Sequence, residues 1–243
     1  MRGVRLQKDT EPAVSSSPSP IPVRTYLRLM HELVIRIELA ANACDGKLNL
    51  NPPYAREYCY LQFRRVCELM ALGCLLLHED IPSTQTNAAK KEWHAQKIMQ
   101  LLNREHPHSF PQCVTRKMID GIHHFDANSK PNALTYREFH ALYNKCGEML
   151  HRGTIKSIEV EAPIAQSEYE VVIGWHRKIV DLMNEHIIAQ KSGNAMYLVS
   201  LKSENGLPAC SLFTNWGEGT VQVASYHLSL NEAGGLVDGK SAT

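Results

Sequence analysis

The sequence has little net charge, few aromatic residues and no long hydrophobic run. Lys and Arg number 26 against 25 Asp and Glu, which argues against a strongly basic nucleic-acid binder but does not exclude a local basic patch. The longest apolar stretch, 66–77, is interrupted by Glu68 and is shorter than the ~20 residues that span a bilayer. Because the first residues also lack a signal-peptide pattern, we expect a cytoplasmic protein with no membrane partner.

The sequence also has no paired-cysteine motif, and we expect no cofactor-binding motif in it. The seven cysteines are odd in number and contain no Cys-x-x-Cys, which indicates free thiols and no disulfide framework. There is no Gly-x-Ser-x-Gly, no His-Glu-x-x-His and no Cys/His zinc spacing. We expect neither a Walker A phosphate loop nor a dinucleotide-binding turn. The sequence therefore predicts no cofactor and no metal.

Hydrophobic periodicity predicts a mainly α fold, namely a four- to five-helix bundle with a small C-terminal antiparallel β-hairpin or three-stranded meander. Residues 1–23, rich in Ser and Pro, are expected to be a disordered leader, 24–192 the bundle, 193–230 the hairpin extension and 231–243 a flexible tail. Expected helices span about 25–44, 53–78, 87–103, 113–123 (short), 135–152 and 167–192. Expected strands are 195–203, 207–214 and 220–228, with Asn205-Gly206 as a hairpin turn.

Two predicted helices have features that bear on the site. Trp93 is expected to be an apolar anchor of the helix over 87–103. Thr135 and Glu138 form a capping box at the start of the helix over 135–152. In that helix a polar stripe follows the apolar face: His140, Asn144, Gly147 and His151. The stripe can line a cleft, or it can be the margin of the core, where polar residues bond to a neighbouring helix.

The order of these elements resembles the HEPN (higher eukaryote and prokaryote nucleotide-binding) helical bundles. The features that carry the resemblance are a first amphipathic helix, a long apolar helix with Glu57 and Arg64-Arg65-Val66-Cys67-Glu68, and a late helix with Asn144-Lys145-Cys146-Gly147-Glu148-Met149-Leu150-His151. The resemblance covers about 24–191. It implies a four- or five-helix bundle that is often dimeric, often linked to bacterial defence or toxin–antitoxin systems, and in active members a metal-independent ribonuclease.

Active members carry an Arg, four to six residues and then a His, which combines phosphate binding with proton transfer. His151 has Lys145 at that spacing instead of Arg. The polar stripe suggests His140, Asn144 and His151 as catalytic candidates, and the resemblance adds weight to His151. Further tentative catalytic candidates are Arg137, Lys145, Arg116 and His123, and tentative ligand-binding candidates are Arg64, Arg65 and Glu68.

Three functions stay open from the sequence. The first is a non-catalytic HEPN-like bundle, as a homodimer or with a protein partner or RNA. The second is a metal-independent ribonuclease with a degenerate Arg/His site. The third is a small-molecule or metal sensor that uses the polar stripe, because Glu148 and His151 form a Glu-x-x-His pair.

Overall fold

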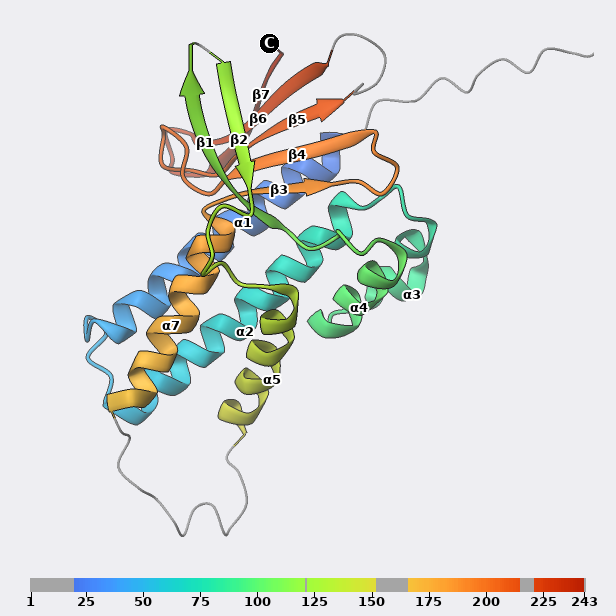
Figure 1. Ribbon diagram of the computed structural model, residues 1–243. Helices are drawn as coiled ribbons and strands as arrows, with labels where there is room; N and C mark the ends of the chain where they lie inside the picture. The colour runs from blue at the N-terminus through green and yellow to red at the C-terminus, as the bar shows by residue number, and fades with distance from the viewer. Residues whose placement is uncertain (1–19, 121, 152–165, 215–220, 243) are drawn as a thin grey trace, which may run out of the picture.

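A helical layer packs against one face of an antiparallel sheet (Figure 1). The computed structural model describes residues 20–120, 122–151, 166–214 and 221–242. The helices in these ranges are α1 Pro20–Cys44, α2 Pro52–Leu77, α3 Asn87–Lys91, α4 Ala95–Glu105, α5 Tyr136–Leu150 and α7 Gln166–Met183, with a 3-10 turn at Pro82–Gln85. The strands are β1 Gln112–Ile119, β2 Ile122–Ala127, β3 Glu185–Ala189, β4 Ala195–Ser200, β5 Ala209–Thr214, β6 Gln222–Leu230 and β7 Leu236–Ala242.

The expected fold class is wrong, because the β structure is not a small C-terminal extension. The seven strands form one sheet in the order β2-β1-β3-β4-β5-β6-β7, with every neighbouring pair antiparallel. The predicted helices over 25–44, 53–78 and 135–152 are observed as α1, α2 and α5, and the turn at Asn205-Gly206 joins β4 to β5, with Gly206 at φ +77°. Strands β1, β2 and β3 lie within residues 24–192, where only helices were expected, so the chain is a helical layer on a sheet and not a helical bundle.

The segment predicted as a short helix over 113–123 is strand β1 with the turn that follows it. The register pairs Ile119 with Ile122, so the sequence between β1 and β2 is Asp120-Gly121. Asp120 has φ +50°, the left-handed conformation that such a hairpin turn requires. Asp-Gly between apolar residues was therefore a strand signal in the sequence.

Strands β3 and β7 were also missed. The helix expected to reach about residue 192 ends at Met183, and Glu185–Ala189 pairs with both β1 and β4. The expected flexible tail contains β7, which pairs with β6 from Ala224↔Ala242 to Leu230↔Leu236. The leader expected at 1–23 lies largely outside the described residues, and α1 already begins at Pro20.

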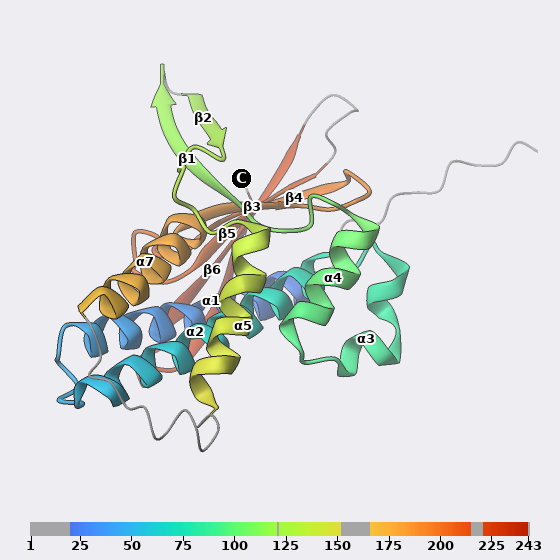
Figure 2. The same ribbon diagram turned by 60° about the horizontal axis from the view of Figure 1, so that its bottom comes forward.

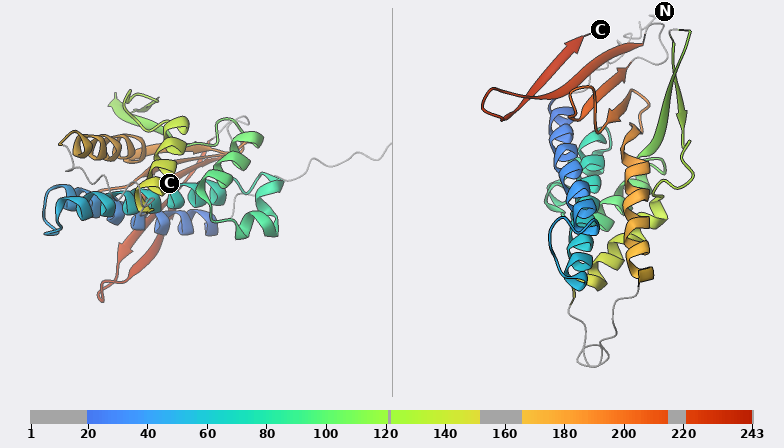
Figure 3. Two further views of the ribbon diagram at one scale, coloured as in Figure 1. Left: turned by 90° about the horizontal axis from the view of Figure 1, so that it is seen from below. Right: turned by 90° about the vertical axis from the view of Figure 1, so that its left-hand side faces the viewer.

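One apolar core joins the two layers. Figures 2 and 3 show α1, α2, α5 and α7 as the long helices that approach the sheet from one side. Inward-facing sheet residues and helix residues share this core: Tyr26, Leu27, Met30, Phe63, Met70, Phe139, Ile179, Ile188, Tyr197, Val199, Leu212 and Leu228. At the centre of the interface the Tyr26 hydroxyl lies 2.6 Å from His186 Nε2, which ties α1 to β3.

Close helix contact at this junction depends on Gly73 of α2. A Cβ at position 73 would stand 2.6 Å from Cε2 of the Tyr26 ring. The glycine therefore allows the ring to lie against the backbone of α2 while its hydroxyl reaches His186. No helix among the described residues has the length and hydrophobicity to cross a membrane.

Candidate functional site

The capping box at the start of α5 is confirmed and fixes the helix that carries the polar stripe. The Thr135 side chain accepts a hydrogen bond from the Glu138 amide, and the Glu138 carboxylate accepts one from the Thr135 amide. Phe139, Leu142 and Cys146 bury the apolar face of α5 in the core. The edge of that face is thereby held beside α2 and α4.

A continuous row of planar side chains crosses from the α3–α4 connection over α5 to α2; we call Trp93, His94, Tyr143 and Arg64 the planar row. The ring centroids of Trp93 and His94 are 5.9 Å apart, and those of His94 and Tyr143 are 5.2 Å apart, edge to face. The Arg64 guanidinium lies 4.9 Å from the centroid of the Tyr143 ring, and its Nη2 donates to the Tyr143 hydroxyl at 3.4 Å. Cation–π contact of this kind holds the guanidinium in a fixed orientation.

Trp93 stands at the open end of the planar row. The side chain is 63% exposed, so the expectation that it anchors a helix in the core is wrong. The expected helix over 87–103 is broken between α3 and α4, where a Glu92 carboxylate oxygen accepts hydrogen bonds from the amides of Trp93 and His94. This break turns the indole out to solvent, which sequence periodicity alone did not indicate.

At the other end of the planar row, Arg64 is held by Glu68. Arg64 Nε lies 3.3 Å from Glu68 Oε1, and Arg65 Nη1 lies 2.8 Å from Glu68 Oε2. Arg64 Nη1 lies 3.8 Å from the point where a Cβ on residue 147 would stand, so Gly147 leaves space beside the guanidinium. The structure therefore brings the tentative ligand-binding residues of α2 next to the glycine of the predicted stripe.

Other stripe residues take part in helix packing. Gln96 of α4 donates to the Asn144 side chain at 2.7 Å and to the His140 carbonyl at 3.2 Å. The His140 ring packs against Tyr136 at 4.6 Å, and burial lowers its pKa from 6.5. Within the stripe, His140 and Asn144 therefore join α5 to α4, whereas Gly147 lies beside Arg64 of α2.

The remaining candidates on α5 are exposed to solvent. Arg137, Lys145 and His151 are exposed, and Lys145 pairs with Glu148 at 3.2 Å. His151 follows the last residue of α5, and its amide donates to the Gly147 carbonyl. Their position leaves them accessible to a large ligand lying along α5.

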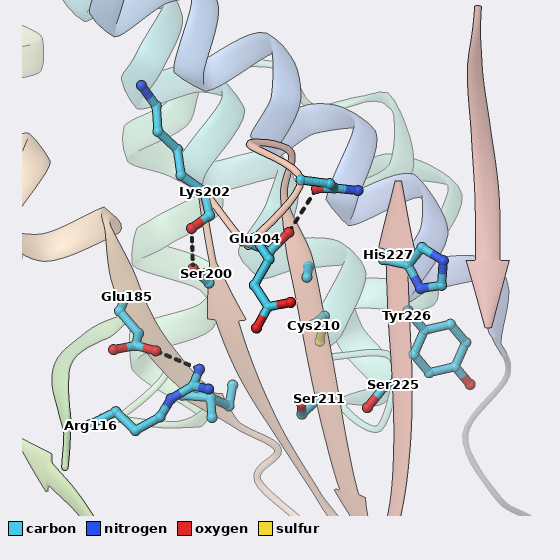
Figure 4. Close-up of a pocket in the computed structure, with 14 residues that line it drawn as sticks. Arg116, Glu185, Ser200, Lys202, Glu204, Cys210, Ser211, Ser225, Tyr226 and His227 are labelled. Carbon is cyan, nitrogen blue, oxygen red and sulfur yellow. Dashed lines mark hydrogen bonds and ion pairs between the residues drawn. The ribbon is translucent and has the colours of Figure 1, made fainter. Parts of the chain in front are cut away.

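Arg116 and His123 belong to the β1–β2 hairpin, not to the stripe. The backbone of His123 pairs with Met118, and its side chain lies outside the described part of the structure. Arg116 donates to Glu185 of β3 at 2.6 Å and lies at the wall of an open cavity of about 680 Å³ on the outer face of the sheet (Figure 4). The pairing of Arg116 with the α5 histidines, considered from the sequence, is not observed.

The sheet cavity has a mixed lining that sequence reasoning did not find. Its floor is formed by side chains of three adjacent strands: the register places Leu198, Ser211 and Ser225 side by side, and Ser200 lies two residues further along β4. Glu204 and His227 border it (Figure 4). Because acidic and basic groups balance here and the space is wide open, the lining favours no particular ligand charge.

The stretch Gly234–Ser241 has Walker A spacing, Gly-x4-Gly-Lys-Ser, which contradicts the expectation that this pattern is absent. A phosphate loop must curl between a strand and a helix so that its amides converge. Here Gly239 and Lys240 lie within strand β7, and the Lys240 ammonium is 5.6 Å from the Tyr226 ring centroid. The extended backbone does not form a phosphate loop.

Within the described ranges, no group of three or more His, Cys, Asp or Glu side chains is placed to hold a metal ion. The best-defined candidate site is therefore the planar row with Gly147 and the exposed end of α5. Comparison with protein-family models, with curated proteins and with solved structures finds no match for this chain.

Proposed function

We propose that this chain is a cytoplasmic protein that carries a HEPN-like motif on α5 of its helical layer and binds single-stranded RNA along α5 without cutting it. The observation that carries the proposal is Trp93, which is 63% exposed at the end of the planar row. An exposed indole fixed by neighbouring rings presents a flat face on which a base stacks. The rest of the row supports the indole through rings that are already in contact, so little side-chain freedom remains to be lost on binding.

Charges near the row suit a phosphate backbone. Lys91 and Lys97 are exposed and lie two residues before and four after Trp93 in the sequence. At the far end Arg64 is oriented by Tyr143, and because residue 147 is glycine no Cβ contacts its Nη1, where one would stand at 3.8 Å. A chain that stacks on Trp93 and passes over α5 would meet cationic groups at both ends, which fits the local basic patch that the near-neutral composition allowed.

Binding without cleavage follows from the residue that replaces arginine before His151. Lys145 occupies that place, and its ammonium pairs with Glu148 at 3.2 Å. Lysine is a point charge and does not form the bidentate contact with a phosphate that guanidinium provides. A histidine without that clamp lacks the charge stabilisation that phosphate transfer requires.

Fluorescence anisotropy of a labelled single-stranded RNA of about ten nucleotides, enough to reach past one stacking site, tests the proposal. Trp93→Ala should weaken binding roughly 5- to 150-fold, since stacking on one aromatic is worth about 1–3 kcal/mol. Tyr54→Ala is the matched control, because Tyr54 is also exposed (60%) but lies at the start of α2, away from the row. It should bind like wild type.

Two further readings separate binding from catalysis. Arg64→Gln should reduce the slope of log affinity against log salt by about 0.7 if Arg64 contacts one phosphate of the single strand. The RNA should stay intact on a denaturing gel after incubation with chelator. Equal binding by wild type and Trp93→Ala refutes the stacking site, and cleavage that is lost in His151→Ala would establish the ribonuclease alternative instead.

A further inference from the structure

Two cysteines of different helices meet at the end of the bundle formed by the α1–α2 connection. Cys44 is the last residue of α1, and Cys59 lies in the second turn of α2. Their sulfur atoms are 3.6 Å apart, within hydrogen-bond reach of a thiol. The helix hairpin thus brings together two thiols that are 15 residues apart in the chain.

We infer that Cys44 and Cys59 are a redox pair, which a hydroperoxide such as hydrogen peroxide converts to a disulfide that joins α1 to α2. A disulfide brings its sulfurs to about 2.0 Å, so the pair must close by about 1.5 Å. Cys44 is the last residue of α1 and is followed directly by the turn 45–48, so a shift of this helix end need not disturb a continuing helix.

The two thiols differ in a way that assigns their roles. All seven cysteines lie in described residues, and Cys44 alone among them is not fully buried. The hydrogen bond between the two sulfurs lowers the pKa of Cys44 and, together with burial, raises the pKa of Cys59, whose thiol is also placed to donate to the Ala40 carbonyl at 3.5 Å. Cys44 is therefore the attacking thiol and Cys59 the resolving one.

The chemistry balances with one peroxide for each disulfide. The Cys44 thiolate attacks one peroxide oxygen, the O–O bond breaks, and sulfenic acid forms as hydroxide leaves and takes up a proton as water. The Cys59 sulfur then attacks the Cys44 sulfur, the S–O bond breaks, and the Cys59 proton leaves with the hydroxide as a second water. Two thiols are oxidised and the peroxide is reduced to two molecules of water.

A second pair of cysteines provides an internal comparison. Cys67 of α2 and Cys146 of α5 are both completely buried, and burial raises the pKa of both thiols. An oxidant in solution does not reach such thiols, and neither is activated. Oxidation should therefore select the pair at the end of the bundle.

Mass spectrometry of the full chain after treatment with hydrogen peroxide tests the inference. We expect a loss of about 2 Da that dithiothreitol reverses, as disulfide chemistry requires. After trypsin, the peptides 37–47 and 57–64, which hold one cysteine each, should appear as one cross-linked species. The melting temperature should rise by roughly 5–10 °C on oxidation, because a loop of this length is closed in the unfolded chain.

Substitutions make the outcome decisive. Cys44→Ser should abolish the cross-link, and Cys146→Ser, which leaves the pair intact, should retain it. The inference is overturned if Cys44 is oxidised to sulfinic or sulfonic acid while Cys59 stays a free thiol. It is equally overturned if Cys44 links two chains instead of closing within one, or if all seven thiols survive treatment of the folded protein.

Discussion

His186 lies where the sheet meets the helices, and both of its ring nitrogens face fixed partners. Nδ1 is 2.8 Å from the Met183 carbonyl oxygen, which can only accept, so Nδ1 carries the proton of the neutral ring. Nε2, 2.6 Å from the Tyr26 hydroxyl, then accepts the hydrogen bond that the phenol donates. Both nitrogens of the neutral imidazole thus have a hydrogen-bond partner. If the ring were protonated, the new proton on Nε2 would face the Tyr26 hydroxyl, which would have to rotate its own proton away in order to accept.

Burial adds to this preference and sets its size. The side chain is fully buried, and desolvation lowers the pKa of His186 from 6.5 to about 4, partly opposed by the bond to the Met183 carbonyl. The unfolded chain binds a proton at His186 near pH 6.5, whereas the folded chain does not bind it until about pH 4. The contribution of the neutral His186 to the free energy of unfolding is therefore fully present above pH 6.5 and is lost as the pH falls from 6.5 to 4. The difference of about 2.5 in pKa corresponds to a loss of about 3 kcal/mol.

Urea unfolding at a series of pH values between 7 and 4, a window taken from the two pKa values, measures this loss. Wild type should lose stability with a slope that approaches 1.4 kcal/mol per pH unit from this residue alone. Burial also lowers the pKa values of His78, His140 and His176, which adds to the slope in the same direction. The test is therefore a difference between variants, not the total slope.

His186→Asn keeps a polar side chain but cannot titrate in this range, and His124→Gln removes an exposed histidine as a control. We expect His186→Asn to start less stable at pH 7 and to have a clearly shallower pH dependence, with His124→Gln unchanged. If His186→Asn loses stability between pH 6.5 and 4.5 as steeply as wild type, the reasoning about the Tyr26–His186 pair is refuted.

Two other substitutions test local packing and capping. Gly73→Ala should destabilise the fold by roughly 1–2 kcal/mol, since a Cβ 2.6 Å from the Tyr26 ring costs more than the gain in helix propensity. Gly174→Ala, with nothing within 4 Å of the new Cβ, should stabilise it by about 0.5–1 kcal/mol; chemical denaturation compares the two, and equal effects would contradict the close contact. Thr135→Ala removes one half of the capping box with Glu138 and should cost about 1 kcal/mol in the same assay, whereas an unchanged midpoint would mean that the cap contributes nothing.

The segments that sequence patterns predicted correctly have long, regular signals of their own. The helices α1, α2 and α5 each carry apolar residues at helical spacing over 15 residues or more. The capping box at Thr135 and the turn at Asn205-Gly206 are local chemistry that works in any surroundings. Such signals determine structure without reference to the rest of the chain.

Strands β1, β3 and β7 lack such a local signal along their length and are recognised in the structure by their pairing with neighbouring strands. In β1 the consecutive residues Cys113 and Val114 are both buried, so the strand shows no alternation at its start. β3 has only five residues directly after a helix, and β7 has few apolar residues and is held by backbone pairing with β6. Apart from the Asp-Gly signal between β1 and β2, these strands depend on which neighbouring strand each one meets in the fold, and the periodicity within one segment does not specify that neighbour.

For the candidate site, sequence and tertiary structure contributed different parts. Helical periodicity by itself placed His140, Asn144, Gly147 and His151 on one edge of α5. Only the folded chain brought Arg64, 79 residues away, over Tyr143, because this contact depends on how α2 packs against α5. The exposure of Trp93 likewise follows from the break between α3 and α4. There the Glu92 carboxylate accepts hydrogen bonds from the amides of Trp93 and His94, although the apolar spacing predicts a continuous helix.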